Sequence, residues 1–152
     1  MNTPATLKTL ALSFTLLASC TGALAAETLG QGIKRRAPQG ITTRLYACVD
    51  KADANASTSA IAACLSAEKA AQDNRLNNTY KTLLGKLNGK AKDALVSSQQ
   101  AWLDFHEKTD AFETTVYGKE AADDLQRLEN EIFRLSERAN ALDKYLAITK
   151  DR

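Results

Sequence analysis

The sequence predicts an all-α fold, namely an elongated antiparallel three-helix bundle to which a disulfide ties a short N-terminal helix. Three long stretches, over residues 60–87, 90–117 and 119–148, repeat apolar residues at the 3- and 4-residue spacing of one helix face. Short turns at Asn88-Gly89 and Tyr117-Gly118 separate them, and such turns force neighbouring helices to run antiparallel. As helices, the stretches would each be about 40–45 Å long. A dimeric coiled coil through the third stretch is the alternative architecture.

Residues 1–26 have the three-part pattern of a secretory signal peptide. Lys8 is their only charged residue, an apolar run follows over 10–18, and Ala23-Leu24-Ala25 fits a signal-peptidase site. The apolar run is too short to span a membrane. We therefore expect the chain to be exported to the bacterial periplasm.

A second export signal overlaps the first. Leu17-Ala18-Ser19-Cys20 resembles the bacterial lipobox, in which Cys20 would be lipidated and would become the first residue of the mature chain. The sequence leaves both routes open, and both of them export the chain. The lipidated form is expected in the outer membrane of a Gram-negative cell, because Thr21 is not a signal for inner-membrane retention.

The chain contains three cysteines. Export lipidates or removes Cys20, which leaves Cys48 and Cys64 in an oxidising compartment. Two cysteines in such a compartment predict one disulfide bond. The ring that they close is short, so the loop-entropy estimate gives a stabilisation of about 3 kcal/mol.

Residues 27–43 are expected to be a flexible linker, because glycines and a proline interrupt the segment. Its basic run, Lys34-Arg35-Arg36, is expected to be solvated. Residues 44–150 then form a single helical domain. Removal of the signal takes away Lys8 and leaves 19 basic against 18 acidic residues, a net charge of +1. A charge so close to zero does not indicate nucleic-acid binding.

The domain is expected to begin with a short helix over 44–54, which carries Cys48, and to continue with a long helix from about residue 60. Ser57-Thr58-Ser59 offers side-chain oxygens that can cap the N-terminus of the long helix. The apolar face of this helix comprises Ile61, Cys64, Leu65, Leu76, Tyr80, Leu83 and Leu87.

The second long helix carries the only tryptophan, Trp102, in the middle of its apolar stripe. A tryptophan in this position is expected to be buried and to anchor the neighbouring helices. The stripe comprises Ala91, Leu95, Ser98, Trp102, Phe105, Thr109, Phe112 and Val116. The stripe of the third helix comprises Ala121, Leu125, Leu128, Ile132, Leu135, Ala139, Leu142 and Leu146.

Four polar side chains lie close to these stripes, at Asp73, Asn77, Gln99 and His106. When the first two long helices pair about the intervening turn, Asn77 faces the region of Gln99, and Asp73 faces His106. Buried polar groups need partners, so we expect a structural hydrogen-bond network between these helices. A binding or catalytic cluster is the alternative interpretation.

The same segments resemble a known family. Asp73-Asn74-Arg75-Leu76-Asn77-Asn78-Thr79-Tyr80, followed by Gln99-Gln100-Ala101-Trp102-Leu103-Asp104-Phe105, is similar to the LprI-like lysozyme-inhibitor domain of bacterial envelope proteins. That family reads roughly A-D-x-x-L-N-x-x-Y and then Q-x-x-W-x-x-(F/Y)-R-(D/E). Ser136-Glu137-Arg138-Ala139-Asn140-Ala141-Leu142 resembles its closing element. The similarity covers about residues 48–146. The motif residues are expected to be structural, and they are Asp73, Leu76, Asn77, Tyr80, Gln99, Trp102, Phe105, His106 and Arg138.

Three features depart from the family pattern. His106 stands where the family has an arginine, a second cysteine pair is missing, and the loop between the second and third long helices is shortened to about Tyr117-Gly118. We therefore do not expect this chain to have a function that depends on the longer loop of its relatives.

The resemblance implies that the protein binds a lysozyme-type muramidase through protein–protein contact. An exposed basic element would enter the carboxylate-lined cleft of the enzyme, and Lys119 and the Lys34–Arg36 segment are the candidates. The alternative is a structural or adaptor envelope protein that binds another periplasmic partner without inhibiting lysozyme. No catalytic arrangement, cofactor or metal site is expected, because His106 is the only histidine and export and the disulfide account for the cysteines. Membrane contact is expected only through the lipid anchor.

Overall fold

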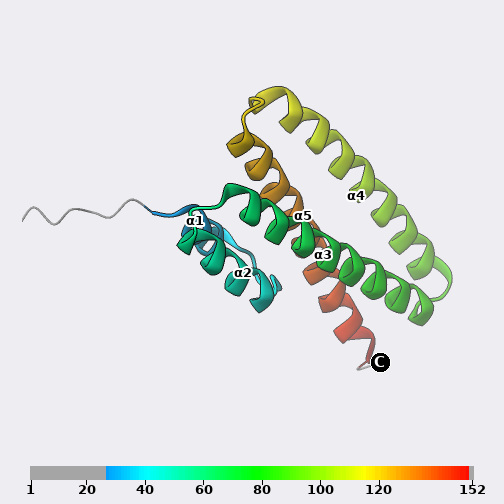
Figure 1. Cartoon of the computed structure of the whole chain (residues 1–152). Helices are drawn as coiled ribbons and strands as arrows, with labels where there is room; N and C mark the ends of the chain where they lie inside the picture. Colours follow the sequence, from blue (N-terminus) through cyan, green and yellow to red (C-terminus); the bar gives the residue numbers. More distant parts are fainter. Residues whose placement is uncertain (1–26, 151–152) are drawn as a thin grey trace, which may run out of the picture.

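The computed structural model describes residues 27–150, which form five α-helices and no β-strand (Figure 1). The helices are α1 (Leu29–Arg36), α2 (Thr43–Ala54), α3 (Thr58–Lys86), α4 (Gly89–Val116) and α5 (Ala121–Lys150). The predicted all-α class is confirmed. The predicted signal peptide and the lipobox with Cys20 lie outside the described residues. None of the described helices is both long and apolar enough to span a membrane.

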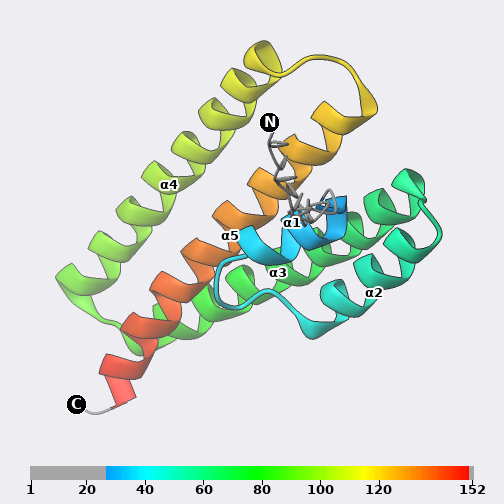
Figure 2. The same ribbon diagram turned by 90° about the vertical axis from the view of Figure 1, so that its left-hand side faces the viewer.

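α3 and α5 pack against each other and form the centre of the fold (Figure 2). The apolar stripe predicted for α5 is buried in this contact, with Ile132, Leu135, Ala139 and Leu142 at most 3% exposed. The alternative of a coiled-coil dimer through this stripe is wrong, because α3 already covers it within one chain.

The core has two parts along the α3–α5 pair. The first part joins α1 and α2 to the N-terminal halves of α3 and α5, and it comprises Ile33, Ile41, Leu45, Val49, Ala52, Ile61, Cys64, Leu65, Leu125 and Ile132. The second part lies between the C-terminal regions of α3 and α5, and it comprises Leu76, Leu83, Leu95, Leu135, Ala139 and Leu142. Only Leu95 in this second set comes from α4.

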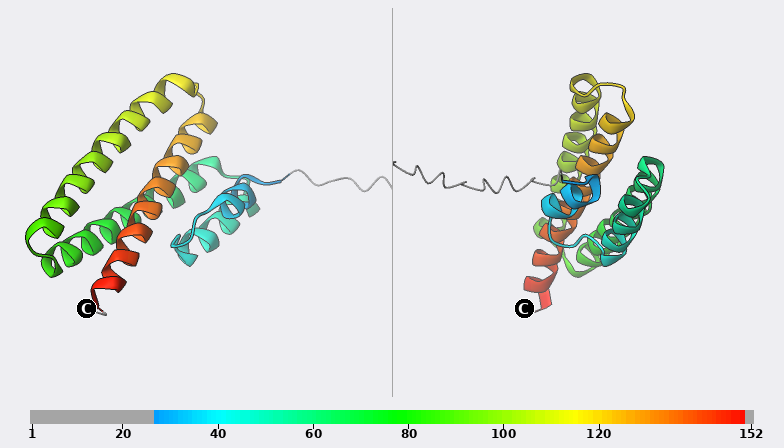
Figure 3. Two further views of the ribbon diagram at one scale, coloured as in Figure 1. Left: turned by 180° about the vertical axis from the view of Figure 1, so that it is seen from behind. Right: turned by 60° about the vertical axis from the view of Figure 1, so that its left-hand side comes forward.

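α4 does not complete a three-helix bundle. It lies along α5, away from α1 and α2, and touches α3 only sparsely (Figures 1 and 3). Only Leu95 and Gln99 of its 28 residues are buried. The predicted arrangement of three mutually packed helices is therefore not found, although the three long helices have nearly the predicted bounds.

Trp102 packs against the second part of the core, but it is only partly buried between α4 and α5, so the prediction that it is a buried anchor is met only in part. Phe105, Phe112 and Val116 of the predicted stripe are 56%, 63% and 62% exposed. The physical reason lies on α5, which presents charged side chains such as Arg134 to α4 and therefore offers no continuous apolar surface for this stripe.

The segment 27–43, expected to be a flexible linker, contains α1. Thr28 forms a capping box with Gln31 at its N-terminus, and Ile33 is 1% exposed in the core. Gly30 allows close packing here, since a Cβ on it would lie 2.4 Å from Oδ2 of Asp53 in α2. The structure thus differs from the linker expectation because the capping box starts a helix and Gly30 lets this helix pack on α2.

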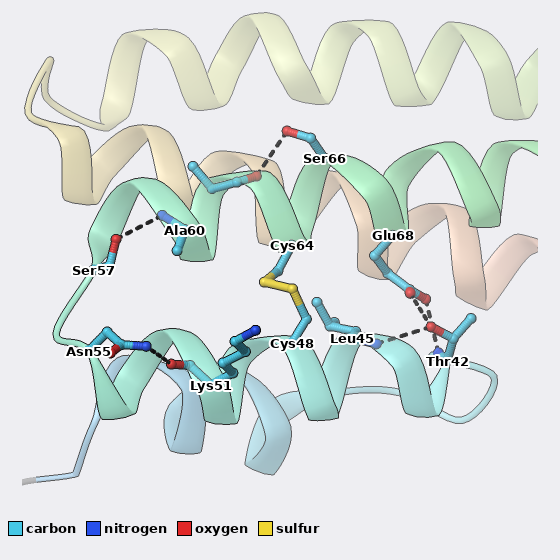
Figure 4. The surroundings of a disulfide bond; sticks show 11 residues. Thr42, Leu45, Cys48, Lys51, Asn55, Ser57, Ala60, Cys64, Ser66 and Glu68 are labelled. Atoms are coloured by element: carbon cyan, nitrogen blue, oxygen red, sulfur yellow. Dashed lines mark hydrogen bonds between the residues drawn. A yellow bond between two sulfur atoms is a disulfide. The ribbon is translucent and has the colours of Figure 1, made fainter.

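The predicted disulfide between Cys48 and Cys64 is confirmed, and it ties α2 to α3 with a Cα–Cα distance of 5.8 Å (Figure 4). Ser57 caps α3, because its Oγ accepts a hydrogen bond of 3.2 Å from N of Ala60. Thr42 caps α2 in the same way, through N of Leu45. The bounds of α2 and α3 therefore follow from capping side chains that the sequence already displays.

Candidate functional site

The expected network of Asp73, Asn77, Gln99 and His106 does not form. Asn77 is exposed on α3, and no hydrogen bond within residues 27–150 joins Asp73 or Asn77 to α4. The reason is that α3 packs on α5 rather than on α4, so the polar side chains of α4 also face α5. This prediction of a polar α3–α4 network is therefore wrong.

The α3 half of the family-like motif packs on α5. Leu76 is 4% exposed in the second part of the core, and Tyr80 packs against the same cluster. Between them, Oγ1 of Thr79 donates a hydrogen bond of 3.0 Å to Oδ1 of Asp143 in α5. The spacing of this motif thus places apolar and polar contacts with α5 on successive helical turns.

The α4 half of the motif meets Arg138 of α5 in one cluster. The ring of Trp102 stacks on the ring of His106, with centroids 4.9 Å apart, and the Arg138 guanidinium lies 5.8 Å from the Trp102 ring centroid. Nε of Arg138 donates a hydrogen bond of 3.0 Å to Oε1 of Gln99, and Nη2 donates one of 3.2 Å to Oγ of Ser98. Burial lowers the pKa of the Arg138 guanidinium, which stays protonated at any physiological pH.

His106 also reaches Glu131 of α5. Nε2 of His106 lies 3.7 Å from Oε1 of Glu131, and Nζ of Lys69 in α3 lies 2.8 Å from the same oxygen. The hydrogen bond to Glu131 raises the pKa of Lys69. Glu131 of α5 therefore contacts both α3, through Lys69, and α4, through His106. His106 is the residue that stands where the family pattern has an arginine.

A second polar group joins α4 to α5 closer to the turn between them. Nη1 of Arg134 lies 2.7 Å from Oε1 of Glu113, and both side chains are 12% exposed. Nδ2 of Asn130 donates to Glu113 at 3.2 Å and to the hydroxyl of Tyr117 at 3.1 Å. We call the whole α4–α5 contact the polar seam.

The polar seam satisfies only part of its hydrogen-bonding capacity. Five buried side-chain atoms in it have no hydrogen-bond partner within residues 27–150, namely Nδ1 of His106, Oε2 of Glu113, Nε of Arg127, and Nε and Nη2 of Arg134. A buried polar atom without a partner costs free energy, roughly 1–3 kcal/mol when it stays unsatisfied. The seam therefore binds α4 more weakly than the apolar core binds α3.

Sequence reasoning missed a buried polar network that fastens the α1–α2 connection. Glu68 and Gln72 on α3 are 3% and 1% exposed. Glu68 accepts a hydrogen bond of 2.9 Å from N of Thr42, and Nε2 of Gln72 donates one of 2.9 Å to the carbonyl of Gly40. The sequence contains the signal, because Glu68 and Gln72 fill the gap between Leu65 and Leu76 on the apolar face of α3.

α5 also binds the segment between α1 and α2. Oγ of Ser136 and Nδ2 of Asn140 both donate to the carbonyl of Gln39, at 3.1 and 2.6 Å. Gly40 has φ +96°, and a Cβ there would lie 2.3 Å from Nη1 of Arg75. This position therefore requires glycine, and the network is structural.

The basic run at residues 34–36 is engaged within the chain. Lys34 pairs with Asp50, and Nε of Arg35 lies 2.9 Å from Oε1 of Glu27. Arg36 makes two hydrogen bonds of 2.8 Å with Glu129, which is 2% exposed, and these bonds raise the pKa of Arg36. Arg35 and Arg36 are exposed, as expected of a solvated basic run, but Lys34 and Arg36 also fasten α1 to α2 and α5.

An open hollow of about 250 Å³ lies beside the Trp102 cluster, and it is lined by Trp102, Phe105, Arg134, Glu137, Arg138 and Ala141. Small-molecule sites enclose about 300–1,000 Å³ and bury most of their ligand. An open hollow with an aromatic wall and an arginine is better suited to a side chain of a protein partner. No group of three or more potential metal ligands lies together in residues 27–150.

Comparisons with known proteins give one match. The family model described as lysozyme inhibitor LprI matches residues 48–151, which contain both disulfide cysteines and all of the motif residues above. No curated protein and no solved structure matches the chain significantly.

Proposed function

The chain belongs to the LprI lysozyme inhibitor family, and we propose on this basis that it is an exported envelope protein that binds and inhibits a lysozyme-type muramidase. The match over residues 48–151 carries the proposal, because it includes all of α3, α4 and α5 and both disulfide cysteines. The proposed action is protein–protein contact without catalysis by this chain.

The turn between α4 and α5 is the element that suits this action. Lys119 is exposed there, and it takes part in none of the ion pairs of the described residues. The turn projects at one end of the α4–α5 hairpin (Figure 1). Muramidases of the lysozyme type act through a pair of carboxylates in a cleft, and a cation on a projecting turn complements such a cleft. The alternative basic segment, 34–36, is less suitable because its side chains already have acidic partners.

A turnover assay tests the proposal. Purified mature protein is titrated into a lysozyme that digests bacterial cell walls, and turnover is expected to fall to a low plateau. Lys119→Glu is expected to weaken inhibition at least about tenfold, which corresponds to about 1.4 kcal/mol. Lys92→Glu is the matched control, since it makes the same charge change on an exposed residue at the opposite end of α4.

The assay also separates the alternatives. Wild-type protein that does not slow the muramidase at any concentration would overturn the proposal and would favour an adaptor that binds another periplasmic partner. Inhibition that is equally sensitive to both charge reversals would remove the assignment to the turn at Lys119.

The location of the protein follows from the export signals, for which the periplasm and the outer membrane are the two proposed destinations. Intact-mass analysis of cell fractions distinguishes them. A diacylglyceryl adduct on Cys20 is expected for the lipoprotein, and a mature chain that starts at Ala26 or Glu27 is expected for the soluble form. An uncleaved chain would contradict both.

A further inference from the structure

α4 carries two stripes on neighbouring faces. The inner stripe faces α5 and includes Leu95, Gln99, Trp102, His106 and Glu113. The outer stripe also has 3- and 4-residue spacing, and all of its members are exposed: Ala91, Ala94, Ser98, Ala101, Phe105, Lys108, Phe112 and Val116. Within residues 27–150, Ser98 is the one member of this face that hydrogen-bonds to α5, through Nη2 of Arg138. The rest of this regularly spaced, exposed face is a surface that can receive another helix.

The C-terminal half of the outer stripe is strongly apolar. Phe105, Phe112 and Val116 are 56%, 63% and 62% exposed, although each belongs to a residue type that is usually buried. α4 is the outermost long helix, with α5 between it and most of the remaining fold (Figures 2 and 3). A contiguous exposed row of this kind marks an interaction surface.

We propose that the outer stripe binds the outer stripe of a second copy of this chain, with the two α4 helices antiparallel. The stripe has small residues in its N-terminal half and large residues in its C-terminal half. In the antiparallel arrangement Phe105 faces Ala101 of the second copy, and Phe112 faces Ala94 of the second copy. Both phenylalanines of the stripe then meet an alanine, as close packing requires. A parallel pair would instead place large against large and small against small.

The same register aligns the two helices along their whole length. The pairs Phe105–Ala101 and Phe112–Ala94 are centred on residue 103, and α4 runs from Gly89 to Val116, so its own middle falls at the same place. A two-fold axis through this point makes the contact self-complementary, which is the usual form of a homodimer interface. The steric match and the helix bounds are independent observations that give one register.

Charge favours the antiparallel direction as well. Residues 89–102 contain two lysines and one aspartate, a net charge of +1, whereas residues 103–116 contain one lysine and four acidic residues, a net charge of −3. Antiparallel pairing places the basic half of each helix beside the acidic half of the other. Parallel pairing would place the two acidic halves together, which is repulsive.

The size of the contact predicts a dimer that dissociates readily. A helix of this length spans about 42 Å and has a face roughly 10 Å wide, so pairing would bury roughly 400–500 Å² on each copy. A total of roughly 800–1,000 Å² lies at the low end for specific interfaces. The turn with Lys119 lies beyond the end of the stripe, so the proposed muramidase contact remains accessible in the dimer.

Sedimentation velocity of the mature chain at increasing concentration tests the proposal. The average mass is expected to rise from the monomer value toward twice that value. Phe112→Ser is expected to weaken self-association at least about tenfold. Leu103→Ser is the matched control, because Leu103 is 51% exposed on the same helix but lies about 200° around the axis from Phe105. Both positions are exposed, so both variants are expected to fold, which circular dichroism verifies.

An exchange of side chains tests the register. Phe112→Ala alone is expected to weaken the dimer, and the double variant Phe112→Ala with Ala94→Phe is expected to restore it within about threefold. The restoration is expected because the exchanged pair again places one large residue opposite one small residue. A double variant that remains as weak as Phe112→Ala would overturn the antiparallel register.

Other outcomes would overturn self-association itself. These are a monomer at all concentrations, or equal effects of Phe112→Ser and Leu103→Ser. A loss of muramidase binding in Phe112→Ser, with a wild-type chain that stays monomeric, would assign the outer stripe to the enzyme instead. Failure of the muramidase assay leaves the sedimentation result unaffected, so the two proposals are tested separately.

Discussion

α5 presents two different faces to its two long neighbours. Toward α3 it presents apolar side chains such as Ile132 and Leu142, which are 0% exposed. Toward α4 it presents Arg134 and Arg138. Arg134 forms an ion pair with Glu113, and Arg138 hydrogen-bonds to Gln99 and lies over the ring of Trp102. Two helices of nearly equal length and similar sequence periodicity are thus bound to one helix by different physical means.

The difference shows which part of the molecule determines stability. Burial of apolar surface contributes about 25 cal/mol for each Å² removed from water. An exchange of hydrogen bonds between water and protein contributes only about 0.5–1.5 kcal/mol per bond, and the partnerless atoms of the polar seam oppose it. The α3–α5 contact therefore holds the fold, and α4 is the long helix that can be perturbed or bound with the least loss.

A cavity in the apolar contact is expected to have the largest effect. Leu142→Ala should lower the free energy of unfolding by about 2–5 kcal/mol, because Leu142 is 0% exposed between α3 and α5. Urea denaturation followed by circular dichroism measures the change. Leu103→Ala on α4 is the control and should change stability by no more than about 0.5 kcal/mol. Equal losses from the two variants would contradict the division of roles.

Reduction of the Cys48–Cys64 disulfide is expected to cost about 3 kcal/mol, since the bond closes a short ring in the unfolded chain. Most of the helical signal should remain, because Leu45 and Val49 still pack α2 into the first part of the core. Denaturation with and without a reducing agent gives the difference. A complete loss of helicity on reduction would show that the bond, rather than the α3–α5 core, holds the molecule together.

Trp102→Ala is expected to cost about 1–2 kcal/mol, less than the roughly 3–5 kcal/mol of a fully buried aromatic residue. The side chain packs against the second part of the core, but it is only partly buried, and its ring also contacts the polar side chains of His106 and Arg138. Urea denaturation of the variant measures the loss. A cost as large as that of Leu142→Ala would mean that the polar seam contributes as much as the apolar core.

The sequence predicts the helices of this fold well but not the neighbours of α4. Periodicity and turn residues place α3, α4 and α5 within a few residues, and the compartment argument gives the correct cysteine pair. Periodicity reports only that one helix face differs from another. It could not show that α5 turns Arg134 and Arg138 toward α4, because that depends on which side of α5 is occupied by α3.

Two further misses have identifiable signals. Thr28 and Gln31 form the spacing of a capping box, which indicates a helix start in spite of the glycines that follow. Glu68 and Gln72 continue the apolar face of α3 and therefore had to be buried with partners. In the candidate site, the motif residues Gln99, Trp102 and Arg138 lie together. The contacts of His106 with Glu131 and of Glu113 with Arg134 could not be predicted from the sequence, because they depend on how α4 lies on α5.

Replacement of the Glu113–Arg134 pair is expected to have the smallest net effect. Arg134→Met alone leaves the Glu113 carboxylate, 12% exposed, without its cation, and should cost about 1–3 kcal/mol. The double variant Glu113→Leu with Arg134→Met should stay within about 1 kcal/mol of wild type or exceed it, because an apolar pair can replace a buried ion pair without loss. A double-mutant cycle in urea measures the coupling. A double variant that loses about 3 kcal/mol or more relative to wild type would show that the pair stabilises α4 strongly. The expected near-zero net cost instead means that the polar seam fixes where α4 lies on α5 while adding little to the stability of the fold.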